Sequence, residues 1–179
     1  MSTKIILSTD RLHLEEATFK DADFFLELLN SPNWIEHIGD RDVKSKEAAI
    51  GYIQRSHVHF YKKYGVGMYK IILKETNQPI GLCGLVKRDT LSHFDLGFAV
   101  LPTYEGKGYT YEASKAVLHY TKSELHLKKV VAFTTVENTK SQNLLLKLGL
   151  EYVDRRKVLD MDMQFLFYQI DFDETLNED

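Results

Sequence analysis

The sequence predicts a mixed α/β fold, and three observations lead to it. Segments with the two-residue period of strands alternate with segments of helical period along the 179 residues. In residues 67–89, two apolar runs flank the polar turn ETNQP, which predicts an antiparallel hairpin. Further along, a strand, a helix and a second strand follow one another, which predicts a crossover between strands.

The first half of the chain predicts a strand, two helices and this hairpin. Residues 5–17 place Leu12 and Leu14 on one face of a half-buried strand. Residues 19–30 and 45–60 have helical periodicity, and His57 and His59 are expected at the surface of a polar helix end. The residues around Trp34, which follow Pro32, are expected to form a loop.

The second half predicts four strands and two helices. The strands are expected at residues 94–101, 128–136, 150–154 and 165–172, and the helices at 109–124 and 138–148. Gly149 is typical of the position that follows a helix C-terminus. Because no repeat or linker divides the chain, we expect a single domain over residues 1–179, with residues 173–179 as a disordered acidic tail.

The composition and charge of the chain argue against several kinds of binding site. Apolar residues make up 44% of the chain and the net charge is −3, so the sequence offers no basic surface for nucleic acid or for a membrane. The single cysteine, Cys83, excludes an intramolecular disulfide, and no His/Cys/Asp spacing suggests a metal site. The N-terminus lacks an apolar signal-peptide core, and no run reaches 18 apolar residues, so a cytoplasmic location is expected.

The stretch LPTYEGKGYTYEA, residues 101–113, places Gly106 and Gly108 between a strand and a helix. Helix N-termini present unpaired N–H groups, and a glycine-rich approach there suits a phosphate group, to which Lys107 would add a charge. The P-loop pattern is absent, and Tyr111 stands where the dinucleotide fingerprint needs a third glycine. A plain loop-to-helix turn is the alternative interpretation.

Three motifs resemble the GNAT acetyltransferase superfamily. VLPTYEGKGYTYEA, residues 100–113, is similar to its coenzyme A pyrophosphate loop, and NTKSQNLLLKLGLEY, residues 138–152, to the motif that follows. Residues 8–30, STDRLHLEEATFKDADFFLELLN, resemble the opening of its ribosomal-protein N-terminal acetyltransferase branch, the RimJ/RimL type. The resemblance covers residues 7–172. It implies a three-layer domain with a central, mostly antiparallel sheet in which two parallel strands splay apart.

The resemblance also implies a site for acetyl-CoA. Main-chain groups of the strand before the loop would meet the acetyl group and pantetheine, the loop would cradle the pyrophosphate, and the next helix would line the far wall. The positions that correspond are Phe98, Ala99 and Val100 on the strand; Glu105, Gly106, Lys107, Gly108, Tyr109 and Thr110 in the loop; and Asn138 and Ser141. Asn138 also suits a plain helix N-cap.

The sequence departs from the family pattern at several positions. Glu105 replaces a Gln, Arg or Trp, so its carboxylate is expected to face solvent and only its N–H to bind phosphate. Thr110 replaces a smaller residue, and Glu15 replaces an arginine. Leu145 occupies the position of the tyrosine that protonates the leaving sulfur in many relatives. Ser141 lies one helical turn earlier on the same face, and either donates to the sulfur or only caps the helix or contacts pantetheine.

For the general base and for the acceptor site, the sequence offers candidates but no motif. Asp95 lies where relatives often carry a glutamate, and shares a strand face with Gly97 and Ala99; it is either the general base or an exposed strand carboxylate. His93 is expected on the same strand face and is the second candidate base, and His93 and Trp34 are candidate acceptor-binding residues.

The sequence therefore predicts an acetyl-CoA-dependent N-acetyltransferase, monomeric or homodimeric, acting on a primary amine, most simply a peptide or protein N-terminus. Two alternatives remain. One is an acetyltransferase of a small amine such as a polyamine or antibiotic, which the acidic residues in WIEHIGDRD, residues 34–42, would favour. The other is a coenzyme A-binding module with weak catalysis.

Overall fold

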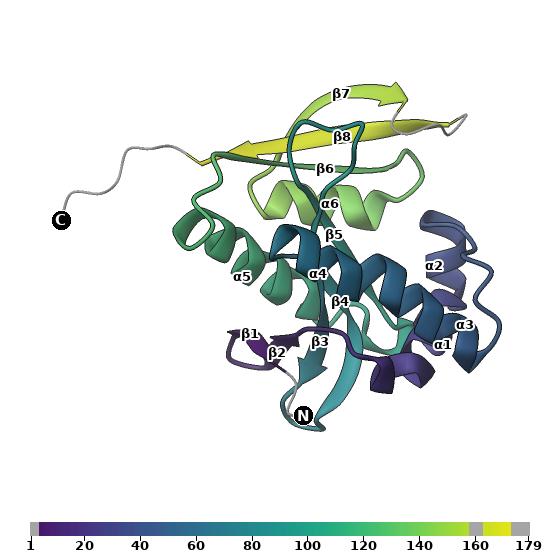
Figure 1. Ribbon diagram of the computed structural model, residues 1–179. Helices are drawn as coiled ribbons and strands as arrows, with labels where there is room; N and C mark the ends of the chain where they lie inside the picture. The colour runs from purple at the N-terminus through teal and green to yellow at the C-terminus, as the bar shows by residue number, and fades with distance from the viewer. Residues whose placement is uncertain (1–3, 158–162, 173–179) are drawn as a thin grey trace.

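A computed structural model describes residues 4–157 and 163–172. The described elements run β1 (Ile5–Ser8), β2 (Leu12–Glu15), η1 (Phe19–Asp21), α1 (Ala22–Leu29), α2 (Pro32–His37), α3 (Lys46–Ile53), η2 (Gln54–Val58), α4 (His59–Tyr64), β3 (Met68–Leu73), β4 (Gln78–Val86), β5 (Asp95–Val100), η3 (Pro102–Tyr104), α5 (Tyr109–Ser123), β6 (Lys129–Thr135), α6 (Thr139–Lys147), β7 (Glu151–Lys157) and β8 (Gln164–Asp171). Figure 1 shows this order along the chain. The predicted tail, residues 173–179, lies outside the described residues, and the single domain stays a prediction.

The strands form one mixed sheet, which confirms the predicted fold class. Within the described residues, eight strands are ordered β1-β2-β3-β4-β5-β6-β8-β7. Neighbouring strands are antiparallel except β5 and β6, which are parallel and are joined by the crossover helix α5. Parallel neighbours need such a crossover, whereas the antiparallel neighbours β3 and β4 are joined by the predicted tight turn.

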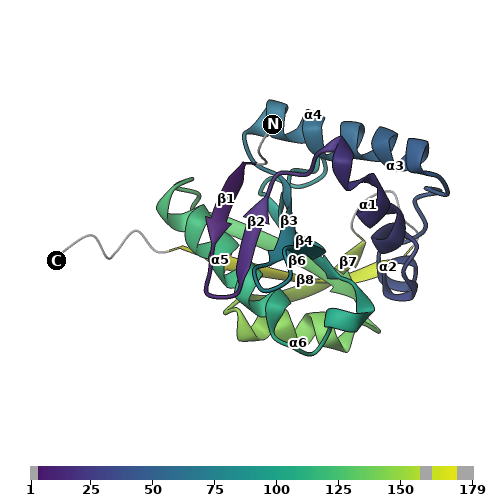
Figure 2. The ribbon, with the colours of Figure 1, turned by 90° about the horizontal axis from the view of Figure 1, so that it is seen from below.

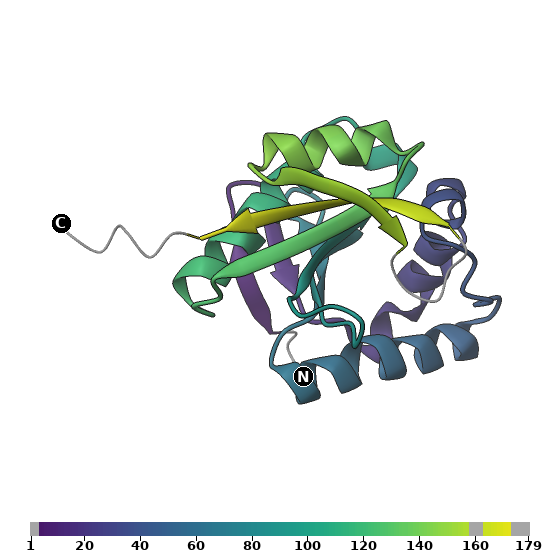
Figure 3. The ribbon, with the colours of Figure 1, turned by 90° about the horizontal axis from the view of Figure 1, so that it is seen from above.

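Helices cover both faces of the sheet, and each face has its own apolar core. Helices α1 to α4 lie on one side of the strands, and α5 and α6 on the other (Figures 2 and 3). Successive side chains of a strand point to opposite faces of the sheet, so each strand contributes to both cores. On β4, for example, Cys83 packs in the core beside α5, and its neighbour Leu82 packs in the core beside α1 and α3. This is the three-layer arrangement that the family resemblance implies.

Three expectations are corrected by the structure. Residues 5–17 form a hairpin, β1 and β2, because Thr9 turns the chain and its N–H bonds to the Leu12 carbonyl at 2.9 Å. Period-two alternation cannot distinguish one long strand from two paired ones. Trp34 lies in helix α2 and not in a loop, since Pro32 occupies the first helical turn, where its missing N–H costs nothing.

The third correction concerns His57, which is buried and not at the surface. The helix predicted at residues 45–60 continues to Tyr64 through the π-helical segment η2, and the altered periodicity turns His57 inward. Its ring packs edge-on against Phe25, with centroids 4.8 Å apart, and its Nδ1 lies 3.2 Å from the Met68 carbonyl oxygen. Burial lowers the pKa of His57 to about 4, so this side chain is neutral at pH 7.

Candidate functional site

Strands β5 and β6 diverge from a single point of contact. Asp95 and Val131 form the one bridge between them in the described residues, with Val131 N–H donating to the Phe94 carbonyl at 3.0 Å. At the other end of β5, Leu101 N–H donates to Ile80, on the β4 side, at 2.8 Å. Because main-chain groups point to alternate edges along a strand, Phe98 and Val100 direct their N–H and C=O groups toward β6, where no pairing is made with the described residues.

The open edge leads into a loop whose backbone donors are also available. Gly106 and Gly108 have φ values of +71° and +80°, a region that residues with a Cβ rarely adopt. Gly108 is the N-cap of α5, so the first N–H groups of this helix have no helical partner. A Cβ at Gly106 would meet no atom within 4 Å, and a Cβ at Gly108 would lie 3.4 Å from Arg11 Nη2, an ordinary contact, so these glycines are needed for their backbone conformation.

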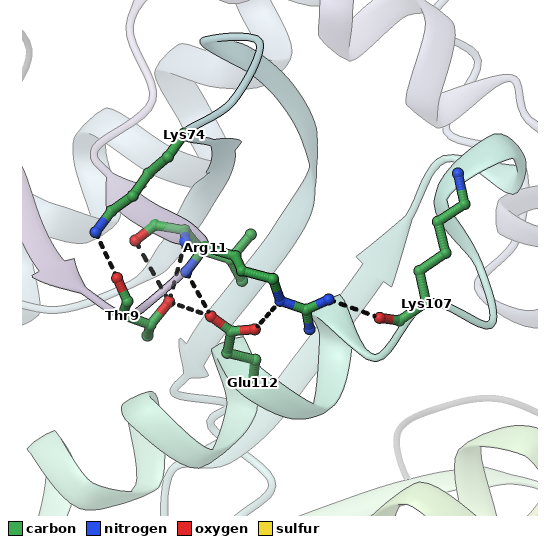
Figure 4. Close-up of polar contacts among 6 residues, drawn as sticks. Thr9, Arg11, Lys74, Lys107 and Glu112 are labelled. Atoms are coloured by element: carbon green, nitrogen blue, oxygen red, sulfur yellow. Dashed lines mark hydrogen bonds and ion pairs between the residues drawn. The ribbon is translucent and has the colours of Figure 1, made fainter.

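Two of the sequence motifs meet across about a hundred residues to hold this loop (Figure 4). Arg11 Nε donates to Glu112 Oε2 at 2.6 Å, and Arg11 Nη1 donates to the Lys107 carbonyl at 3.1 Å. Glu112 Oε1 accepts from Thr9 Oγ1 at 2.6 Å, and Lys74 donates to the Thr9 carbonyl. Partial burial would raise the pKa of Glu112, but the bonds from Thr9 and Arg11 outweigh it and lower that pKa. Both side chains lie in motifs that are visible in the sequence, but the sequence alone gives no sign that the two are in contact.

The Glu105 carboxylate was expected to face solvent, but in the structure it has two side-chain partners. It accepts a hydrogen bond from Asn33 of α2 and forms an ion pair with Lys140 of α6, Nζ to Oε2 3.0 Å. The glycine loop is thereby linked to helices on both sides of the sheet. Lys107 and Thr110 lie in the same loop and helix start, and the Lys107 side chain points away from Arg11 (Figure 4).

Helix α6 begins beside the open end of the strand divergence. Asn138 is its N-cap, with Oδ1 accepting from Ser141 N–H at 3.1 Å, which confirms the capping interpretation. Gln142, which the sequence analysis did not single out, donates to the carbonyls of Thr135 at 3.3 Å and Val136 at 2.8 Å and ties the helix to the end of β6. Leu145 is fully buried in the core, and Ser141, one turn earlier, is half-buried.

Asp95 is buried and not an exposed strand carboxylate. Only 3% of the residue is exposed, and its Oδ1 accepts from Arg88 Nε at 3.2 Å. Burial raises the pKa of Asp95 to about 6, against the opposing effect of Arg88. His93 is exposed in the loop before β5, so strand alternation does not place it on the face of Asp95.

Trp34 lies in the core on the α1–α3 side of the sheet. It packs in one apolar cluster with Leu101 and, at the edge of that cluster, Ala99, both near the end of β5. Its indole Nε1–H is buried without a hydrogen-bond partner among the described residues. The acidic residues of the following segment are partly neutralised, since Asp40 forms an ion pair with Lys44 at 2.9 Å. No helix of the described part of the chain has the length and apolar character needed to cross a bilayer.

Known proteins are similar to this chain in sequence. The acetyltransferase (GNAT) domain family matches residues 11–151. YoaA, an uncharacterized N-acetyltransferase of Bacillus subtilis strain 168, is 28% identical over 148 residues, 82% of each chain. The ribosomal protein uS5-alanine N-acetyltransferase of Escherichia coli K12 is 25% identical over 157 residues, which cover 83% of this chain and 79% of that enzyme.

Solved structures agree at the level of the fold. RimL, a ribosomal L7/L12 α-N-protein acetyltransferase in complex with coenzyme A, superposes with a TM-score of 0.81 over 94% of this chain and 98% of that one. At 15% identity this likeness concerns the fold alone. Because the family match spans most of the chain, the protein belongs to the GNAT family and is an N-acetyltransferase.

Proposed function

We propose that the protein transfers an acetyl group from acetyl-CoA to the α-amine of a peptide or protein N-terminus. The observation that carries the proposal is the course of β5, whose open edge runs directly into the glycine loop and the N-terminus of α5. A strand edge with unpaired main-chain groups suits the amides of pantetheine, and a helix N-terminus preceded by glycines suits a pyrophosphate.

The residues have separate tasks in this proposal. Acetyl-CoA, when bound, supplies the acetyl group as a reactive thioester. The N–H groups of Phe98 and Val100 orient the pantetheine arm and polarise the acetyl carbonyl, and the main chain of residues 105–110 holds the pyrophosphate. The amine attacks the acetyl carbonyl in its neutral form, Asp95 takes the proton that the amine nitrogen releases, directly or through a water, and Ser141 donates a hydrogen bond at the departing sulfur. A thiol pKa near 8.5 means that the leaving sulfur needs only weak assistance.

The acceptor class follows from the pKa of the candidate base, because a carboxyl with a pKa of about 6 can accept the proton of an attacking neutral amine but leaves a lysine ammonium protonated. Leu145 is buried in the core, and the Asp95 carboxylate is nearly covered. At pH 7, roughly a tenth of peptide α-amines are neutral, because their pKa is about 7.8, but only about one lysine side chain in two thousand is. Such a site favours amines that lose their proton easily. The similarity to a ribosomal-protein alanine N-acetyltransferase supports the same choice.

Two matched peptides test this acceptor assignment. One has a free N-terminus and no lysine, and the other has a blocked N-terminus and one lysine; thiol release gives kcat/KM, and mass spectrometry locates the acetyl group. We expect the first peptide to be favoured by at least about tenfold at pH 7, and the gap to narrow toward pH 9 as lysine deprotonates. Equal rates at pH 7, or a preference for lysine, would overturn the α-amine assignment.

A further inference from the structure

Arg88 is a cation held beside the candidate base. It lies in the loop between β4 and β5, with Nε 3.2 Å from Asp95 Oδ1 and its Cζ 5.0 Å from the centroid of the Phe133 ring on β6. About a third of its side chain is exposed. Arg88 therefore spans the point where the two parallel strands separate, with one contact on each strand.

The aromatic support of Arg88 is itself fixed by packing. Phe133 lies opposite Phe167 in the β6–β8 register, and its ring meets Phe165 edge-on with centroids 5.3 Å apart. Leu91, from the same loop as Arg88, packs on this cluster. A guanidinium resting on a fixed aromatic face loses little further freedom when it binds a ligand, because its plane is already set.

Most of the guanidinium's hydrogen-bonding capacity is unused. An arginine side chain has five N–H donors in a planar fork. Among the described residues, only the Nε donor of Arg88 makes a hydrogen bond, and neither terminal nitrogen does. A fork with free terminal donors matches a carboxylate, which it binds through two parallel hydrogen bonds.

Other cations act on the groups around Arg88. Lys87 acts together with Arg88 in opposing the raised pKa of Asp95. Burial raises the pKa of Tyr52 on α3, and the positive charges of Arg41, Arg88 and Arg55 oppose this rise. These cations favour a negatively charged ligand beside Asp95.

We propose that Arg88 binds a carboxylate of the acceptor, so that the enzyme prefers peptides with an acidic residue next to the free N-terminus. The inference rests on the proposed function and names the substrate class of the same site. An amine that gives its proton to Asp95 must lie beside it, and one residue of extended chain spans about 3.5 Å. The side chain that reaches Arg88 is therefore that of the second residue.

Peptides that differ only in their second residue, glutamate or glutamine, test the inference. We expect wild-type kcat/KM to favour glutamate by about tenfold, which corresponds to one charge-assisted hydrogen-bonded pair. Arg88→Gln should bring the ratio close to one. Arg88→Lys, which keeps the charge and the packing of the loop but lacks the fork, should give an intermediate ratio. Peptide affinity, measured by calorimetry in the presence of coenzyme A, should follow the same order.

Two control variants separate this role from other effects. Lys115→Gln changes the net charge by the same amount at an exposed position of α5, on the opposite face of the sheet, and should leave the ratio unchanged. Asp95→Asn should slow both peptides and preserve the glutamate preference. A ratio that falls equally in Arg88→Gln and Lys115→Gln would overturn a specific role for Arg88.

The remaining outcomes distinguish the inference from the proposed function. Equal kcat/KM and equal affinity of the wild-type enzyme for the two peptides would overturn the inference and leave α-amine acetylation standing. Free glutamate is assayed alongside, because its carboxylate comes from a small molecule. If it is acetylated in preference to the peptides and Arg88→Gln abolishes this preference, Arg88 is supported and the peptide acceptor is contradicted.

Discussion

Asp95 combines a position at the base of the strand divergence with a pKa suited to a base near neutral pH. A general base works best when its pKa lies close to the operating pH, and burial brings the pKa of this carboxyl to about 6. The ion pair with Arg88 keeps the carboxylate ionised at pH 7 in spite of that burial. An exposed aspartate, with a pKa near 3.9, would be a much weaker base.

We therefore expect Asp95→Asn to lower kcat/KM at pH 7.5 by about a hundredfold, the usual contribution of a positioned base. The wild-type enzyme must lose a proton from Asp95, at about pH 6, and from the peptide amine, at about pH 7.8. A plot of log(kcat/KM) against pH should therefore have a slope of two below pH 6 and one between the two pKa values. In Asp95→Asn the slope should be one at all pH values below the amine pKa of about 7.8.

Asp171→Asn is the matched control for this experiment. The substitution removes a carboxylate on β8 whose Oδ1 lies 3.0 Å from Lys129 Nζ. The variant should keep the wild-type dependence of kcat/KM on pH. A slope of two that persists in Asp95→Asn would show that another group is the base.

At the scale of elements, the hairpin of β1 and β2 braces the N-terminus of α5. The glycines give the loop the backbone conformation it needs, but glycine also leaves the unbound loop more freedom to lose on binding. Arg11 restricts that freedom by binding Glu112 on the helix and the Lys107 carbonyl in the loop, while its guanidinium lies 4.5 Å from the Tyr109 ring centroid. The main-chain donors of the loop, which we propose bind the pyrophosphate, are thereby held in place.

Glu112→Gln should raise the KM for acetyl-CoA about fivefold and leave kcat nearly unchanged. The size follows from about 1 kcal/mol, a charge-assisted hydrogen bond discounted for the exposure of Arg11. Steady-state kinetics with a fixed peptide measure both constants. Asp23→Asn breaks an ion pair with Lys46 that lies away from the loop, and should change neither constant. A loss of kcat alone in Glu112→Gln would contradict a role in holding the loop.

At the scale of the whole molecule, the sheet consists of two arms joined at Asp95 and Val131. One arm contains β1 to β5 and the other β6, β8 and β7. The second arm also carries α6 and the aromatic side chains of Phe133, Phe165 and Phe167. The ion pair between Glu105 and Lys140 links the two arms at the open end of the strand divergence. A ligand that fills the divergence would complete the pairing that the strands themselves do not make.

Amide hydrogen exchange along β5 tests this arrangement within one strand. In the free protein, the amides of Phe98 and Val100 should exchange faster than those of Gly97 and Ala99, which face β4. Acetyl-CoA should slow exchange at Phe98 and Val100 and change the other two much less. Uniform slowing of all four amides, or no change at Phe98 and Val100, would contradict insertion of the ligand along this edge.

Much of the architecture could be predicted from local patterns. Periodicity in windows of ten or so residues identified α5, the hairpin of β3 and β4, and the crossover, because these elements bury one face against the core. The glycine loop was found because a helix N-terminus and positive φ values leave a composition signal. The same windows missed the turn within residues 5–17 and helix α2, where a short segment has too few periods to show its type.

The sequence by itself therefore determined the fold class, the family and the position of the glycine loop, since each depends on residues close together in the chain. Only the tertiary structure decided how the charges of the site are balanced. Glu112 and Arg11 are separated by 101 residues, and Glu105 and Lys140 by 35, yet each pair is in contact. The pKa of a carboxylate depends on what lies across from it and on how much water it loses, and both are properties of the packed molecule. For this reason Asp95 could be located in the sequence as a candidate, but its burial, its raised pKa and its partner Arg88 could not.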